Sequence, residues 1–238
     1  MLPIISIIGV IASGKRTLGR KLAKEFGFYH LSVGDFFRSM SEIPLPIAVQ
    51  ERIDEKYQGG ELIALDDLKK LCDHMPSSVY MPAYIRQFRD LRNTIPSDIA
   101  IPLLEQKIEE VNNQFKYKCK GILIDGFPRK LGHFMGASMI RDCTRLVICI
   151  ECHPENARAR FARRLGSSHD ISVYEERLCS FQQNLPDLVK EFEARRLLLI
   201  SPNESDMNIN QAYQALVNRL SSNEHWKAIV GPTYFPLF

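Results

Sequence analysis

The sequence predicts an α/β fold, in which helices cover both faces of a five-stranded parallel sheet. Five short apolar runs alternate with longer segments of helical periodicity, and this alternation is typical of a parallel sheet. Hydrophobic residues make up 45% and charged residues 25% of the 238-residue chain, as in an ordinary globular domain. The predicted strands are residues 3–8, 28–31, 121–125, 145–151 and 197–200.

Helices are predicted between these strands. The first follows a glycine-rich loop, and its apolar residues Leu18, Leu22 and Phe26 recur at helical spacing. Another helix is expected to start at residues 32–35, and the later ones cover residues 103–115, 130–141, 154–165, 171–194 and 208–220. Residues 41–98 contain five prolines and a less regular pattern, so we interpret this segment as an insertion into the domain.

Composition and charge exclude several classes of protein. A net charge of +3 is too small to suggest nucleic acid as the main partner. No segment reaches the roughly 18 apolar residues that are needed to span a bilayer, so we expect no membrane partner. The apolar N-terminus has no basic region before it and leads directly into Lys15 and Arg16, which favours a cytoplasmic protein over a secreted one.

The loop from Gly9 to Thr17 (GVIASGKRT) lies between the first predicted strand and the first helix. Small residues let successive backbone N–H groups point at an anion, and the positive end of the following helix adds to the attraction. Lys15 then offers a mobile charge to the outer phosphates, and the Thr17 hydroxyl offers a ligand to Mg²⁺. This context predicts a P-loop NTPase-type three-layer α/β/α fold, with a glycine-rich turn that binds nothing as the alternative.

General P-loops place Ser or Thr directly after the lysine, whereas this chain has Arg16 there and Thr17 one position later. The offset Gly-Lys-x-Thr resembles the adenylate kinase and UMP-CMP kinase family, the nucleoside monophosphate kinases. Three further segments resemble this family in the same order: HLSVGDFFR (30–38), NTIPSDIAIPLL (93–104) and IDGFPRK (124–130). The resemblance spans residues 4 to about 220, apart from residues 41–92.

The resemblance implies a role for each matching residue. The implied catalytic residues are Lys15, Arg129, Arg164 and Arg177. The implied ATP contacts are Gly9, Ser13, Gly14, Lys15, Arg16, Thr17 and Arg160. The implied contacts of the acceptor monophosphate are Ser32, Arg38, Arg129 and His133, and the residues implied to hold Mg²⁺ are Thr17 and Asp125. Arginine suits phosphate because its planar guanidinium binds two oxygens at once.

Simpler interpretations stay open for several of these residues. Arg38 could be a surface arginine, and Asp125 could be a turn or capping residue. The arginines near residues 160–164 could form a solvated basic face, and His133 could lie on a helix surface.

The chain also departs from the family pattern. Arg16 and Ala12 replace two glycines of the loop, and Ala12 requires an unstrained φ there. The lid that covers ATP in the family is reduced to a short loop at residues 165–170, without one of the lid arginines. Arg163 or Arg16 is the candidate to compensate for that missing charge.

The predicted function is transfer of the γ-phosphoryl group of ATP·Mg²⁺ to a nucleoside monophosphate, AMP or UMP/CMP, by a monomer. Val33 favours a pyrimidine mildly, since UMP-CMP kinases carry a small apolar residue there. We predict a kinase domain at residues 1–222, with residues 41–98 as the divergent acceptor-binding insertion, and a C-terminal tail at residues 223–238, either packed or loosely held. The alternative is a catalytically weakened nucleotide-binding protein that acts as a partner or regulator; a P-loop hydrolase is a third interpretation.

Overall fold

The computed structural model describes residues 1–56, 62–72, 75–91, 94–165, 171–203 and 208–231. The chain divides into two compact units, each with its own core. The first consists of Met1–Val33 with Ile101–Phe238, and the second is Gly34–Ala100. None of the described helices is long and apolar enough to cross a membrane.

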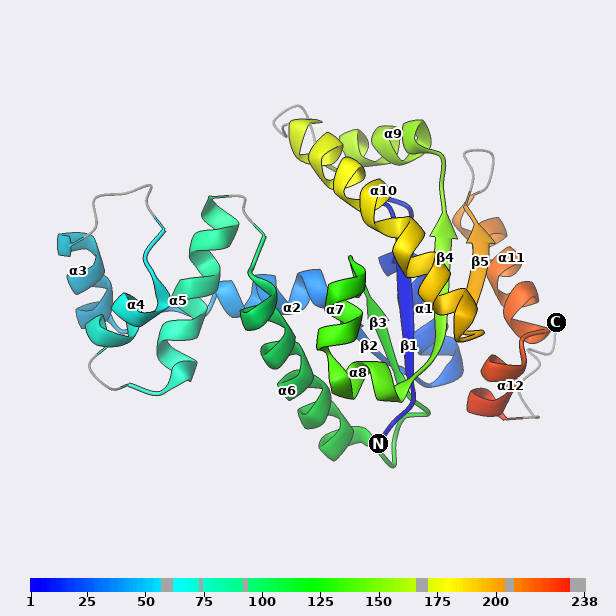
Figure 1. Ribbon diagram of the computed structural model, residues 1–238, viewed down its shortest axis with the longest axis horizontal. Helices are drawn as coiled ribbons and strands as arrows, with labels where there is room; N and C mark the ends of the chain where they lie inside the picture. The colour runs from blue at the N-terminus through cyan, green and yellow to red at the C-terminus, as the bar shows by residue number, and fades with distance from the viewer. Residues whose placement is uncertain (57–61, 73–74, 92–93, 166–170, 204–207, 232–238) are drawn as a thin grey trace. The chain divides into compact units, whose positions relative to one another are not determined.

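A five-stranded sheet forms the centre of the first unit (Figure 1). Its strands are β1 (Ile4–Gly9), β2 (Tyr29–Ser32), β3 (Ile122–Asp125), β4 (Thr144–Glu151) and β5 (Leu198–Pro202). They lie in the order β2-β3-β1-β4-β5, and every pair is parallel. The predicted five-stranded parallel sheet is therefore confirmed, and each predicted strand lies within two residues of the observed one.

Helices cover both faces of this sheet, because alternate residues of its strands are buried on opposite sides. On one face, Ile5 and Ile7 pack with residues of α1 (Lys15–Phe26), α11 (Ile209–Ser221) and α12 (Glu224–Val230). On the other face, Ile8 and Val147 pack with residues of α7 (Leu131–Gly136) and α10 (Ile171–Ala194). Figure 1 shows the sheet between these two layers, which is the predicted α/β/α arrangement.

This unit also contains α8 (Ser138–Cys143), α9 (Pro154–Leu165) and α6 (Ser97–Phe115) from Ile101 onward. The segment predicted as one helix at residues 130–141 forms two, α7 and α8, which are separated by Ala137. Gly136 weakens the end of α7, and the Met139 N–H at the start of α8 donates to Glu105 Oε1 at 2.8 Å. A partner from another helix therefore satisfies a backbone donor that a continuous helix would have paired internally.

The segment after α11 packs on the core. Trp226 of α12 is 3% exposed, and its ring lies 4.9 Å from the Phe26 ring and 5.5 Å from the Phe28 ring. Lys120 Nζ donates to the last carbonyl of α12, that of Val230, at 2.8 Å. Residues 224–230 thus contribute to the same hydrophobic core as α1.

The second unit is helical, with α2 (Val33–Ser41), α3 (Ile47–Lys56), α4 (Leu65–Leu71) and α5 (Ser77–Asp90). Its small core gathers Ile63, Leu68, Tyr84 and Phe88. Arg86 of α5 fastens the end of α2 and the segment after it, since Nε donates to the Ser41 carbonyl at 2.8 Å and Nη2 to the Ile43 carbonyl at 2.5 Å.

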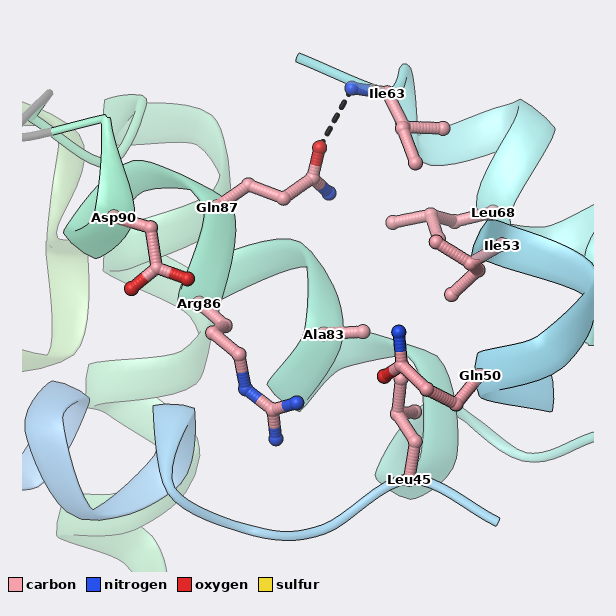
Figure 2. Close-up of a pocket in the computed structure, with 9 residues that line it drawn as sticks. All are labelled: Leu45, Gln50, Ile53, Ile63, Leu68, Ala83, Arg86, Gln87 and Asp90. Atoms are coloured by element: carbon pink, nitrogen blue, oxygen red, sulfur yellow. Dashed lines mark hydrogen bonds between the residues drawn. The ribbon is translucent and has the colours of Figure 1, made fainter. Parts of the chain in front are cut away.

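A cavity of about 160 Å³ lies inside this second unit, between α3, α4 and α5 (Figure 2). The Gln87 side-chain oxygen accepts the Ile63 N–H at 2.6 Å, which fixes the amide so that its nitrogen faces the cavity. Within the described part of the chain, Gln87 Nε2 has no hydrogen-bond partner. Sites for drug-sized ligands measure about 300–1,000 Å³, so this space suits a few waters that satisfy Gln87 rather than a nucleotide.

Candidate active site

The glycine-rich loop curls tightly between β1 and α1. Gly9 has φ +146°, and a Cβ there would lie 2.6 Å from the Ile150 carbonyl oxygen of the adjacent strand. Gly14 caps α1 with φ +96°, a conformation that favours glycine. Ala12 has φ +61°, so the prediction of an unstrained backbone at this position is wrong. The left-handed conformation costs an alanine about 1–2 kcal/mol, and the closure of the loop imposes that cost.

Lys15 stands at the start of α1 and curls back over the loop. Its Nζ donates to the carbonyls of Gly9 at 2.7 Å and Val10 at 2.5 Å, and to Ser13 Oγ at 3.4 Å. The ammonium is thus held at the loop, where the first turn of α1 contains no acidic residue to compete with an anion. Thr17 follows in the same turn and is exposed.

Asp125 ends β3 and lies in register with Ile7 of β1 and Ser32 of β2. It is 6% exposed, with Oδ2 at 3.6 Å from His30 Nε2 and 3.9 Å from Arg16 Nε. No hydrogen bond to Asp125 Oδ2 is found among the described residues. A buried carboxylate oxygen with spare capacity, close to the first turn of α1, fits a hard cation such as Mg²⁺ or a water bound to it.

The charge of Asp125 acts on one of the predicted catalytic arginines, Arg129. Arg129 follows β3, and its Nε donates to the Gly126 carbonyl at 3.3 Å. The Arg129 side chain reaches solvent, but the protein that surrounds it and the positive charge of Arg177 both lower its pKa, whereas Asp125 opposes them. The charges of Arg129 and Arg177, 48 positions apart in the sequence, therefore act on each other in the folded chain.

His133 lies one turn into α7, against the loop that carries Arg129. Its ring stacks on Phe127 with centroids 5.7 Å apart and an interplanar angle of 5°. Burial, followed by the charges of Lys130 and Arg129, lowers the pKa of His133 to about 4. The imidazole is therefore neutral at physiological pH, and Nδ1 is buried without a hydrogen-bond partner among the described residues.

Arg160 of α9 lies on the other side of the loop. Its Nη2 donates to Asn203 Oδ1 at 3.3 Å and its Nη1 to Cys152 Sγ at 3.4 Å. Asn203 in turn donates from Nδ2 to the Ser13 carbonyl at 2.7 Å. Asn203, which the sequence did not single out, therefore links Arg160 to the glycine-rich loop.

The remaining predicted site residues lie on β2, α2 and α9 or fall outside the residues that the structure describes. Ser32 is 7% exposed at the end of β2, next to Asp125 in register. Arg38 lies on α2 in the second unit and pairs with Asp35. The Arg163 side chain is exposed on α9. The Arg164 side chain and residues 166–170 of the predicted lid (165–170) fall outside the described residues.

Two residues of the site, His30 and Asn203, were missed. His30 lies within the HLSVGDFFR segment, and its Nε2 faces Asp125. Asn203 directly follows β5 and lies three residues after the last predicted strand, and polar residues at the carboxyl ends of parallel strands are a signal that could have identified it.

No family model matches the chain. The chain is 25% identical over 227 residues to human adenylate kinase isoenzyme 5, which covers 93% of the chain and 34% of that protein. It is 28% identical over 198 residues to a Saccharomyces cerevisiae uridylate kinase, which covers 81% of the chain and 78% of that protein. It is 24% identical over 225 residues to UMP-CMP kinase 1 of Oryza sativa subsp. japonica, with 93% of the chain and 76% of that protein covered.

The chain thus spans about a third of the length of the adenylate kinase isoenzyme 5 proteins that it matches. Although each identity is modest, relatives with three kinds of kinase name align over most of the chain. The similarity to these relatives is consistent with the observed parallel sheet and with the glycine-rich loop and its offset threonine. Over most of its length the chain is thus similar to nucleoside monophosphate kinases, the adenylate kinase and UMP-CMP kinase family.

Proposed function

We propose that this protein transfers the γ-phosphoryl group of ATP to a nucleoside monophosphate and produces ADP and a nucleoside diphosphate. The observation that carries the proposal is the glycine-rich loop that holds Lys15, with the buried Asp125 close to Arg16 in the first turn of α1 and Arg129 within the influence of the Asp125 charge. Phosphoryl transfer needs little covalent help from a protein and depends on positioning and on neutralising charge. This arrangement offers both.

ATP is held by its phosphates on the loop. The backbone N–H groups of residues 9–17 and the positive end of α1 attract the phosphate oxygens, and Lys15 exchanges its loop carbonyls for the outer phosphates. Arg160 approaches the same nucleotide from α9. Thr17 and Asp125 are the residues that would hold Mg²⁺, which neutralises charge on the β- and γ-phosphates when it is bound.

The acceptor monophosphate is bound by arginines on its phosphate and by polar groups on its base. We assign Arg129 and, from the resemblance, Arg38 to the phosphate, and Arg177 and Arg164 to the charge that develops on the group in transfer. Ser32 and the neutral His133 are assigned to the acceptor nucleoside. A neutral imidazole with one free ring nitrogen accepts a hydrogen bond from a base edge that an imidazolium could not.

AMP, UMP and CMP are the candidate acceptors. The relatives carry the names of adenylate, uridylate and UMP-CMP kinases, so all three acceptors are tested. We expect a monomer that works in the cytosol.

A second function is supported by the same loop. Ala12 adopts a left-handed backbone, and Arg16 places a positive charge near the carboxylate proposed for Mg²⁺. Both features favour a protein that binds nucleotides with weakened transfer and acts as a partner or regulator.

A coupled assay that follows ADP formation separates these functions. The protein is incubated with ATP and Mg²⁺, alone and with each of AMP, CMP, UMP and dCMP. Turnover that requires one monophosphate supports the kinase, whereas ATP binding without transfer supports the weakened protein. ADP release without any acceptor would indicate a hydrolase.

Matched variants connect the activity to the site. K15A is expected to lower turnover at least a hundredfold, because it removes a cation at the transferring phosphate. R158A is the control, since Arg158 is an exposed arginine of α9 whose Nε pairs with Glu175 at 2.9 Å. Equal activity in K15A and the wild type would refute the proposed function.

A further inference from the structure

The residue after β5, Asn203, joins three segments of the first unit that are distant in the sequence. Its backbone N–H donates to the Glu151 carbonyl at 2.8 Å, which extends the pairing of β5 with β4 by one residue. Its side chain contacts the glycine-rich loop at Ser13 and helix α9 at Arg160. Asn203 is 4% exposed, so its side chain has little solvent with which to bond instead.

The two ends of the Asn203 amide have opposite partners. Nδ2 faces the Ser13 carbonyl, which can only accept, and Oδ1 faces the Arg160 guanidinium, which can only donate. The amide therefore has a single satisfactory orientation. A carboxylate at this position would keep the acceptor for Arg160 and lose the donor to the loop, and an alanine would lose both.

The loop is shaped to receive this amide. A Cβ on Gly14 would lie 2.5 Å from Asn203 Nδ2, so the amide packs directly against the glycine that caps α1. The absence of a side chain at position 14 thus serves both the backbone conformation and the approach of Asn203. Arg158, two residues before Arg160 on α9, shows the contrast, because it pairs with Glu175 on the surface.

We infer that Asn203 is a positioning residue, which holds Arg160 at a set place relative to the phosphate loop. The inference rests on the proposed function, because Arg160 matters only if it contacts the nucleotide whose phosphates the loop holds. An arginine side chain loses much conformational freedom when it is fixed, and Asn203 restrains it before the nucleotide arrives. Arg160 then contributes to affinity only while position 203 provides an acceptor.

Binding of mant-ATP, followed by fluorescence in wild-type protein, N203A and N203D, each with and without R160A, tests this inference. We expect R160A to weaken binding about tenfold in the wild type and at least as much in N203D, which retains the acceptor. In N203A the same R160A substitution is expected to change binding less than twofold. A role of Asn203 in folding alone would leave the cost of R160A equal in all three backgrounds.

Control variants and melting curves distinguish a loss of Arg160 positioning from a loss of folding. N218A removes an exposed asparagine of α11, whose side-chain oxygen accepts from Gln214 Nε2, and is expected to bind mant-ATP like the wild type. Thermal melting checks that each variant folds, and N203S replaces N203A if the latter does not. An R160A cost in N203A equal to that in the wild type overturns the inference and leaves the proposed function intact. Failure of the wild type to bind mant-ATP would refute both.

Discussion

The Arg16 guanidinium faces the Asp125 carboxylate, with Nε 3.9 Å from Oδ2. The arginine stands where the family that the chain resembles keeps glycine, and the carboxylate is the group proposed to hold Mg²⁺. The Asp125 side chain is 8% exposed and that of Arg16 is 43% exposed, so the cation reaches the buried acid from the solvent side. Arg16 thus provides a positive charge within the chain at the place where a metal ion would act.

Replacing Arg16 is therefore expected to lower the magnesium requirement. Exposed ion pairs contribute about 0–1 kcal/mol, so R16A should reduce the half-saturating Mg²⁺ concentration by up to about fivefold. A magnesium titration of phosphoryl transfer at fixed ATP measures this change. R20A, at an exposed position of the same helix, is the control. A higher magnesium requirement in R16A would mean that Arg16 supports the metal instead of competing with it.

Because Ala12 has a left-handed backbone, we expect its replacement by glycine to change the stability of the protein little. A12G relieves about 1–2 kcal/mol of strain, but it loses about 0.8 kcal/mol of methyl burial and about 0.4–1 kcal/mol through the freer unfolded chain. These terms nearly cancel, so we expect the free energy of unfolding to stay within about 0.5 kcal/mol of the wild type.

Urea unfolding of A12G beside A212G checks this expectation. Ala212 is fully buried in α11, where glycine should cost at least about 1 kcal/mol. Equal losses in the two variants would show that position 12 carries no strain.

The lowered pKa of His133 predicts a dependence of stability on pH. Its pKa is about 4 in the folded chain against 6.5 in a model peptide, so the unfolded state binds more protons between these values. The contribution of His133 to stability is complete above about pH 6.5 and is lost as the pH falls through about 4. Urea unfolding from pH 7.5 to 4.5 should therefore show a smaller decline in H133Q than in the wild type. Parallel declines in the two proteins would contradict the lowered pKa.

Trp226 is expected to be essential for the stability of the first unit. Its ring contacts Phe26 and Phe28 at the edge of the main core. W226A should lower the free energy of unfolding by about 3–5 kcal/mol, and W226F should lower it by much less. Equilibrium unfolding of both variants measures the difference. A loss below about 1 kcal/mol in W226A would mean that residues 224–230 are not part of the cooperative core.

The elements of the sheet could be predicted because each depends on local pattern. The run at residues 3–8 and the loop after it indicated a strand, a glycine-rich turn and a helix, and the structure places all three within a residue or two. The break at Ala137 could not be predicted in this way. It depends on Glu105, a residue of α6 that is 34 positions away from the Met139 N–H it accepts.

The residues of the candidate site also fall into two groups, those that local motifs predict and those that only the folded chain brings together. Lys15, Thr17, Asp125 and Arg129 could be named because short motifs contain them, and their roles stay predictions. Asn203 could not, since its partner Ser13 is 190 positions away, and the place of Arg16 beside Asp125 depends on strand order.

By itself the sequence determined the strands, the glycine-rich loop and the family that the chain resembles, because these follow from spacing along the chain. Only the tertiary structure decided that Asn203 joins the loop to Arg160, that Arg16 faces Asp125 and that Trp226 completes the core. Those contacts arise from the order in which parallel strands align. Strand order is set by the burial of whole faces, which no local pattern records.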